Sequence, residues 1–188
     1  MNERNKKYRL LDRDTIVLAG RKLYRIQALR DVCYSVKEGK VGGYVESEAN
    51  LSHEGRCWLY HDACAYEDAR VEEDATLWGH ATLRGKAKLI EGAALWGKAI
   101  VQGEAKVGGR SRILDQVVIG GKAVVKGRVS LHDDVHVGGN AYLEGEVASL
   151  SLVIEGNTMI MGSTILQGYG RFSEKEAMLE AGSFRVAP

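Results

Sequence analysis

Few residues in this 188-residue sequence have types and spacings that suggest covalent chemistry. His80 is the best candidate for a general base, since an imidazole exchanges protons near neutral pH, but no carboxylate is obviously placed to orient it. A solvated histidine at a corner of the fold is the alternative interpretation. Cys33, Cys57 and Cys64 are odd in number and lack CxxC spacing, so we expect reduced thiols rather than a zinc or redox site. No dinucleotide-binding, P-loop, nucleophile-elbow or zinc-protease motif is present.

Basic side chains suggest binding chemistry instead. The candidate ligand-binding or partner-binding residues are Arg70, Lys88, Lys106, Arg110 and Arg128. The net charge is only +1, but it is banded along the chain: residues 1–40 carry +6, 45–74 carry −7, 84–128 carry +7 and 129–188 carry −5. A positive band can hold an acidic ligand or partner, although a solvated surface with accidental banding would look similar. The near-neutral total, with aromatic residues away from the basic column, argues against nucleic acid.

A six-residue repeat over residues 57–147 must position these side chains. The first residue of each hexad is small and the third is aliphatic or alanine, as in Ala75 and Leu77. Two inward residues separated by one outward residue are typical of a strand. The fifth residue is mostly glycine, with Asp115 and Asp133 as substitutes, which predicts a corner with positive φ. Each hexad therefore predicts one short strand and one corner.

Large outward side chains indicate three hexads per turn. Tyr60, Trp78 and Trp96 recur at every third hexad, and Leu114 continues the series. The sequence thus predicts triangular coils of three hexads with these residues in one column. The column either only stabilises neighbouring coils or forms an oligomer interface, and we favour the interface because soluble monomers rarely expose such a stripe. The predicted interface of a dimer or trimer is Trp58, Tyr60, Trp78, Trp96 and Leu114.

The flanking segments predict caps for the two open ends of the solenoid. Residues 1–50 form the expected β-rich N-terminal cap, with strands at Tyr8–Leu11, Thr15–Leu18 and Lys22–Leu29. Residues 51–170 form the solenoid, whose pattern slips by one residue after Val147. Residues 171–188 include a capping-box pattern at Ser173 and Glu176, an apolar run at 177–179 and a glycine stop at Gly182, which predict a short C-terminal capping helix. The sequence has no apolar run of membrane-spanning length and no secretory signal, so we expect a cytoplasmic protein.

The periodicity resembles the hexapeptide-repeat, left-handed β-helix superfamily. The segments 7–10, 42–45, 50–52 and 55–58 resemble the entry region of the YdcK-like group of bacterial and phage proteins. This resemblance covers nearly the whole chain and implies an all-β, single-stranded parallel β-helix with a left-handed coil. Acyltransferases of the superfamily carry a catalytic histidine near a loop that leaves the coil and bind acyl-CoA between subunits, which would give the catalytic role to His80. Residues 57–147 contain no such loop.

The resemblance also brings zinc enzymes of the same fold into consideration, since these gather three histidines across coils. Lys98 and Gln116 follow His80 at successive coils, so we expect no metal site. We therefore expect a non-catalytic binding or interaction protein without a cofactor. It would be phage-encoded or bacterial, and would act on a host protein or sequester a small phosphorylated molecule in a counter-defence role. An acyl-CoA-dependent acyltransferase and an architectural assembly protein are the alternatives, so enzymatic activity stays an open question.

Overall fold

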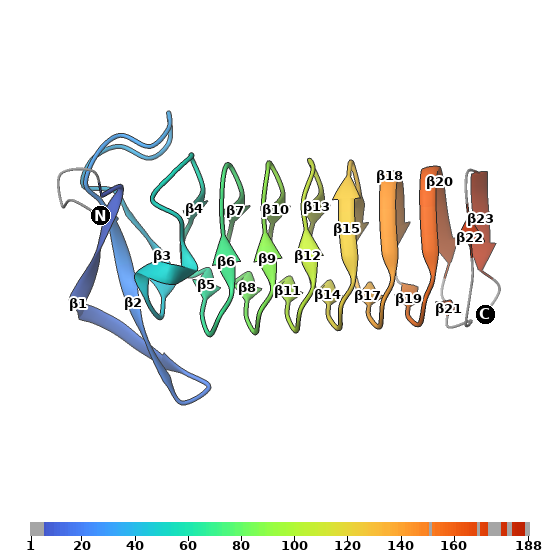
Figure 1. Ribbon diagram of the computed structural model, residues 1–188, viewed down its shortest axis with the longest axis horizontal. Coiled ribbons are helices and arrows are strands. Elements are labelled where there is room, and N and C mark those ends of the chain that lie inside the picture. The colour runs from blue at the N-terminus through green and yellow to red at the C-terminus, as the bar shows by residue number, and fades with distance from the viewer. Residues whose placement is uncertain (1–5, 151, 169, 173–177, 180–181, 187–188) are drawn as a thin grey trace.

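The computed structural model describes residues 6–150, 152–168, 170–172, 178–179 and 182–186. It is a solenoid of short parallel strands that starts at an antiparallel N-terminal cap (Figure 1). The predicted parallel β-solenoid is confirmed. Within the described residues, no helix has the length and apolar character that crossing a membrane requires.

The strands form three faces, because partners in neighbouring coils lie three hexads apart, as for Thr76, Ala94 and Arg112. The first face consists of β4 (Trp58–Leu59), β7 (Thr76–Leu77), β10 (Ala94–Leu95), β13 (Arg112–Ile113), β16 (Ser130–His132) and the end of β18 (Tyr142–Leu150). The second consists of β5 (Cys64–Ala65), β8 (Thr82–Leu83), β11 (Ile100–Val101), β14 (Val118–Ile119), β17 (His136–Val137), β19 (Leu152–Ile154) and β21 (Gly170–Phe172). The third consists of β6 (Arg70–Val71), β9 (Lys88–Leu89), β12 (Lys106–Val107), β15 (Val124–Gly127), the start of β18 and the start of β20 (Met159–Gly168), whose end continues the first face.

The interior follows the hexad pattern. Small first residues and aliphatic third residues, such as Ala93 and Leu95, are fully buried. The fifth residues make the corners with positive φ, including Gly97 at +70° and Asp115 at +56°. Glutamates occupy the same conformation in several coils, for example Glu91 at +58°. The strand-and-corner interpretation of the repeat is therefore confirmed.

The predicted register slip is also present. Ser130 still pairs with Ala148, in the register of three full hexads, whereas His136 pairs with Val153, one residue short of that register. The coil therefore becomes one residue shorter between the first and the second face. Tyr142 then pairs with Met159 in the new register. The parallel ladder continues across the change.

The N-terminal cap is a β-hairpin joined to a third strand. Strands β1 (Tyr8–Leu18) and β2 (Arg21–Ala28) pair antiparallel, so the two predicted strands at Tyr8–Leu11 and Thr15–Leu18 are one strand with irregular pairing between them. Strand β3 (Val41–Val45) pairs antiparallel with β2 and parallel with β5. The sheet therefore runs from the cap into the second face of the solenoid without a break.

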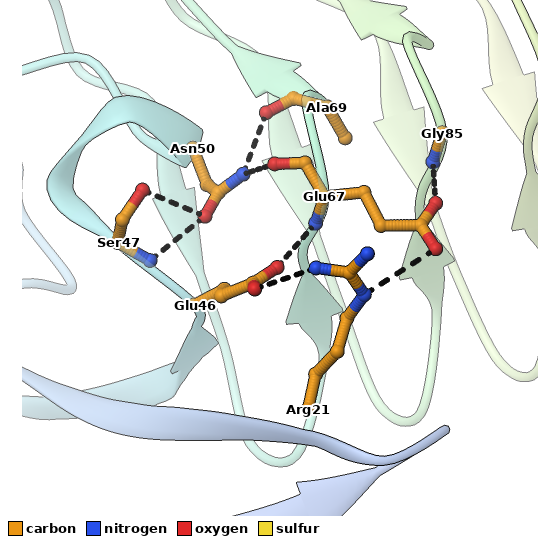
Figure 2. A network of polar contacts seen from close by, with 7 residues as sticks. All are labelled: Arg21, Glu46, Ser47, Asn50, Glu67, Ala69 and Gly85. Carbon is orange, nitrogen blue, oxygen red and sulfur yellow. Dashed lines mark hydrogen bonds and ion pairs between the residues drawn. The ribbon is translucent and has the colours of Figure 1, made fainter.

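A polar network fastens the cap to the first coils (Figure 2). The 3-10 turn η2 (Glu48–Asn50) carries the buried Asn50, whose amide donates to the backbone carbonyls of Glu67 at 2.8 Å and Ala69 at 2.9 Å. Arg21 of the hairpin lies between the carboxylates of Glu46 and Glu67. The first coil is thereby bonded to the cap through side chains as well as through the sheet.

The predicted C-terminal helix needs a correction where it can be compared. Residues 173–177 and 180–181 lie outside the described residues. Met178–Leu179, which we placed in the helix, instead form strand β22, and Gly182–Val186 form β23. Both strands pair in parallel with β20. The helical prediction is therefore wrong at Met178–Leu179, because their backbone extends the parallel ladder rather than starting a helical turn.

Candidate ligand-binding groove

An open groove of about 1140 Å³ lies along the corner where the third face of the solenoid meets the first. Gly92 and Ala94 line it, and Arg110 and Arg112 occupy the equivalent positions one coil further on. Equivalent residues in parallel strands are only ~4.8 Å apart. Two small side chains beside two long ones therefore leave a hollow on the surface.

Four arginines line this groove, and three of them, Arg110, Arg112 and Arg128, belong to two adjacent coils. These three also surround a smaller hollow of about 290 Å³ next to it. The Arg110 backbone N–H donates to the Gly127 carbonyl, which places Arg110 and Arg128 in adjacent coils of one corner column. Arg112 follows on β13, on the other side of the inward-facing Ser111. The geometry gathers three guanidinium groups from two coils around one surface.

Carboxylates at the groove already have partners. Asp74 accepts from the Arg56 guanidinium, and these hydrogen bonds hold the pKa of Asp74 below its usual range. Glu91 accepts a hydrogen bond from the Gly109 backbone N–H. Arg128 pairs with Glu146, with 3.1 Å between Nη1 and Oε1. Arg110 and Arg112 form no ion pair with any residue that the structure describes, so the groove presents two uncompensated cations.

The other wall of the groove is apolar and contains Trp96 and Leu114. The Trp96 indole stacks on Trp78 with ring centroids 4.5 Å apart, and Trp78 stacks on Tyr60 at 3.5 Å. The predicted aromatic column is thus present. Trp96 at its end remains 39 % exposed, whereas Trp78 is half-buried and Tyr60 is buried. The stacking fixes the indole of Trp96 at the edge of the arginine cluster.

The aromatic stripe is narrower at the surface than we expected. Trp58 is fully buried and packs edge-on against Tyr8 of the cap. The Tyr60 hydroxyl lies 2.9 Å from the Ser35 hydroxyl, under the loop between β2 and β3. Interpreting these two residues as exposed is therefore wrong, because the cap of the same chain covers them. Trp78, Trp96 and Leu114 are the members of the predicted interface that keep exposed surface.

The predicted basic residues divide into two groups. Arg110 and Arg128 belong to the groove, whereas Arg70, Lys88 and Lys106 follow one another in register on the third face. Arg70 and Lys88 border a separate hollow of about 500 Å³ that also contains the acidic Glu67 and Asp68. The expected separation of aromatic and basic columns therefore holds for the third face but not in the groove, which is lined both by Arg110 at the corner and by Trp96 on the first face.

Sequence reasoning missed Arg112. The alternation of inward and outward residues in the repeat could have identified it. Ser111 is an inward first residue, so the residues on both sides of it must point outward. Two arginines flanking an inward residue at a corner lie on adjoining faces and meet at their common edge. The hollow itself was indicated by Gly92 and Ala94, the small outward residues that precede the arginines by one coil.

His80 lies at a corner, directly after Gly79 with its positive φ. It is exposed, and its ring makes no hydrogen bond or ion pair with a described residue. The equivalent residue in the preceding coil is Asp62, which is paired with Arg25 at 3.2 Å. No set of three or more histidine, cysteine or carboxylate side chains is grouped for metal binding in the part of the chain that the structure describes.

A buried pair with shifted pKa values, Lys7 and Cys57, lies where the cap meets the first coil. Lys7 is fully buried, and its Nζ donates to the Cys57 carbonyl at 2.9 Å and contacts the Cys57 Sγ at 3.1 Å. Burial lowers the pKa of Lys7 and raises the pKa of Cys57. Because a buried thiol of this kind is inert, we assign the pair to the packing of the cap.

Comparison with known proteins identifies no relative of this chain from which a function could be inferred. No protein-family model matches the chain, and no curated protein matches its sequence.

Proposed function

We propose that this chain is a non-catalytic binding protein that holds a small phosphorylated molecule in the arginine groove. The observation that carries the proposal is the pair of uncompensated guanidinium groups, Arg110 and Arg112, next to Arg128. Guanidinium groups bind phosphate through two parallel hydrogen bonds, and such charged bonds are stronger than neutral ones. Their backbones belong to a rigid parallel ladder, which favours a preformed site.

A phosphorylated ligand fits the groove better than an acidic host protein does. The groove is concave and its cations are concentrated at one corner, whereas a protein partner needs roughly 800 Å² of surface on each side. The flatter column of Arg70, Lys88 and Lys106 on the third face is the surface that an acidic host protein would use. The two surfaces can therefore be tested separately.

We propose a bacterial or phage context for this activity. The resemblance to the YdcK-like group supports such a source, with the protein acting in the cytoplasm to sequester a phosphorylated signal. The exposed parts of Trp78 and Leu114 support contact with a second copy of the chain, as a dimer or trimer. In this proposal the solenoid holds the arginines in place, and the groove binds the phosphorylated molecule.

Isothermal titration calorimetry with inorganic pyrophosphate tests the proposal. We expect the double variant Arg110→Gln/Arg112→Gln to bind at least ~30-fold more weakly, since charged hydrogen bonds contribute about 1.5–3 kcal/mol each. Lys98→Gln/Lys122→Gln is the matched control, because it removes two exposed cations that lie outside the groove. Equal affinities of the two double variants, or no binding by the unaltered protein, would rule out the groove as a phosphate site.

Two further variants separate the competing functions. Lys88→Gln/Lys106→Gln should leave pyrophosphate binding unchanged and would weaken only a partner that docks on the third face. His80→Ala should also leave it unchanged. Turnover of acyl-CoA that depends on His80 would instead favour the acyltransferase.

A further inference from the structure

The groove has two chemically different walls, and the second wall restricts the ligand class. Arg110, Arg112 and Arg128 provide the cationic wall, and Trp96 with Leu114 provides the apolar one. Inorganic phosphate or a sugar phosphate would use only the first. The ligand that uses both must join an anionic group to a flat apolar group.

Between residues 57 and 147, Trp96 is the one large hydrophobic side chain with more than a third of its surface exposed. Its indole is held in one orientation, because one face packs on Trp78 in nearly parallel stacking at 3°. The next member of the column is Leu114, a residue much smaller than an indole. A fixed, partly exposed indole is a ready contact for another ring, since aromatic rings stack on bases of every type.

Groove size agrees with such a ligand. The volume of about 1140 Å³ is slightly above the roughly 300–1,000 Å³ that small-molecule pockets usually offer. The small residues Gly92 and Ala94 leave the space between the two walls open. An added Cβ at Gly92 would make only ordinary contacts, at 3.4 Å from the Gly109 carbonyl oxygen, so backbone packing does not explain the absence of a side chain there.

We infer that the ligand is a nucleotide, whose base contacts Trp96 and whose phosphates contact Arg110, Arg112 and Arg128. This inference rests on the proposed phosphate-binding function and adds the base. Glu91, which lines the groove at the corner beside Arg110, keeps acceptor capacity beyond its bond to Gly109 for a ribose hydroxyl. Two adjacent phosphates suit the cluster, because Arg110 and Arg128 lie one coil apart along the corner.

Calorimetry with three probes tests the inference: adenosine diphosphate and guanosine diphosphate, with inorganic pyrophosphate as the anion without a base. We expect both nucleotides to bind about tenfold or more tightly than pyrophosphate, because a stacked base contributes about 1–3 kcal/mol. Trp96→Leu should remove most of that advantage, so that the variant binds the nucleotides and pyrophosphate with similar affinities. Leucine is already accepted at the equivalent position 114, so this variant should fold, and circular dichroism with thermal unfolding checks that it does.

The outcomes separate this inference from the proposed function. Nucleotides that bind no better than pyrophosphate, with Trp96→Leu without effect, would refute the base contact and leave a phosphate site. Failure of all three probes to bind the unaltered protein would refute both. Affinity for short oligonucleotides that rises with their length would indicate single-stranded nucleic acid and would also refute the inference.

Discussion

At the scale of single residues, the polar side chains in the left-handed corners stabilise the next coil. Glu67 accepts from the Gly85 N–H at 2.6 Å, Glu91 accepts from Gly109, and Asp115 accepts from the Asp133 N–H at 3.3 Å. The members of each pair are three hexads apart, so each bond joins two coils. Positive φ costs about 1–2 kcal/mol in a residue with a Cβ, and the hydrogen bond offsets part of that cost.

Replacement of Glu91 tests this compensation. Glu91→Ala keeps the strained φ of +58° but loses the bond to Gly109, so we expect a loss of about 1 kcal/mol in the free energy of unfolding. Glu91→Gly loses the same bond but relieves the strain, and it should be about 1 kcal/mol more stable than the alanine variant. Urea unfolding measures both. Equal stability of the two variants would show that the corner is not strained.

His53 gives the protein a predicted sensitivity to acid. It is buried beside Tyr8, with ring centroids 4.4 Å apart, and burial lowers its pKa from the ordinary value of 6.5. As pH falls below about 6.5, the unfolded chain takes up a proton on His53 before the folded chain does. The folded state is then favoured less, by at most about 1.4 kcal/mol per pH unit.

The free energy of unfolding should therefore fall between pH 7 and pH 5. In His53→Gln it should fall less steeply. His136→Gln is the control, because His136 is an exposed histidine of the second face. This pH range lies above the one in which Glu48 takes up a proton, because the hydrogen bond with Lys6 lowers the pKa of Glu48 from its ordinary value of 4.5. An unchanged slope in His53→Gln would assign the acid sensitivity to other groups.

At the scale of elements, the repeat made the solenoid predictable, but local patterns misled at its ends. Period-six spacing fixes strand and corner together, because every hexad must bury the same two positions. The spacing of Tyr60, Trp78 and Trp96 adds the length of the coil. The capping-box pattern before Met178–Leu179 signals a helix only locally. In the structure these residues form strand β22, since the open end of β20 offers them backbone partners that a local pattern does not reveal.

The site was predictable in part for the same reason. Arg110 and Arg128 could be placed at one corner because they occupy the same hexad position, three hexads apart. Burial of Trp58 and Tyr60 could not be predicted, because it depends on how the cap folds back over the first coil. The inclusion of Trp96 in the arginine groove depends on how far the groove extends across the first face, which the columns of equivalent residues do not show. The hand of the coil stays a prediction from the resemblance.

Asn50 tests how strongly the cap holds the solenoid. Its buried side chain donates to two backbone carbonyls and accepts from the Ser47 N–H at 2.9 Å. Asn50→Ala leaves these buried groups without partners, so we expect a loss of about 2–4 kcal/mol in the free energy of unfolding. Asn50→Asp should be similarly destabilised, since a carboxylate accepts from Ser47 but repels the two carbonyls. Chemical denaturation checks both, and a loss below about 1 kcal/mol would mean that the network in Figure 2 is dispensable.

At the scale of the whole molecule, the groove connects successive coils. Its lining residues Asp74, Glu91, Arg110 and Arg128 come from successive coils of one corner. In a solenoid each repeat contacts only its neighbours, so a ligand that touches several coils adds links that the backbone ladder lacks. Ligand binding should therefore raise the unfolding temperature of the entire chain.

Native mass spectrometry of the purified protein measures assembly and ligand together. We expect a dimer or trimer that retains a phosphorylated molecule. Arg110→Gln/Arg112→Gln should keep the subunit number and lose the ligand, because it removes cations without altering the apolar wall. Trp78→Gln should lower the subunit number, since it makes an exposed part of the aromatic column polar. A monomer of the unaltered protein without a ligand would contradict both the interface and the retained ligand. An oligomer without a ligand would support the interface and would direct the search for a partner to the third face.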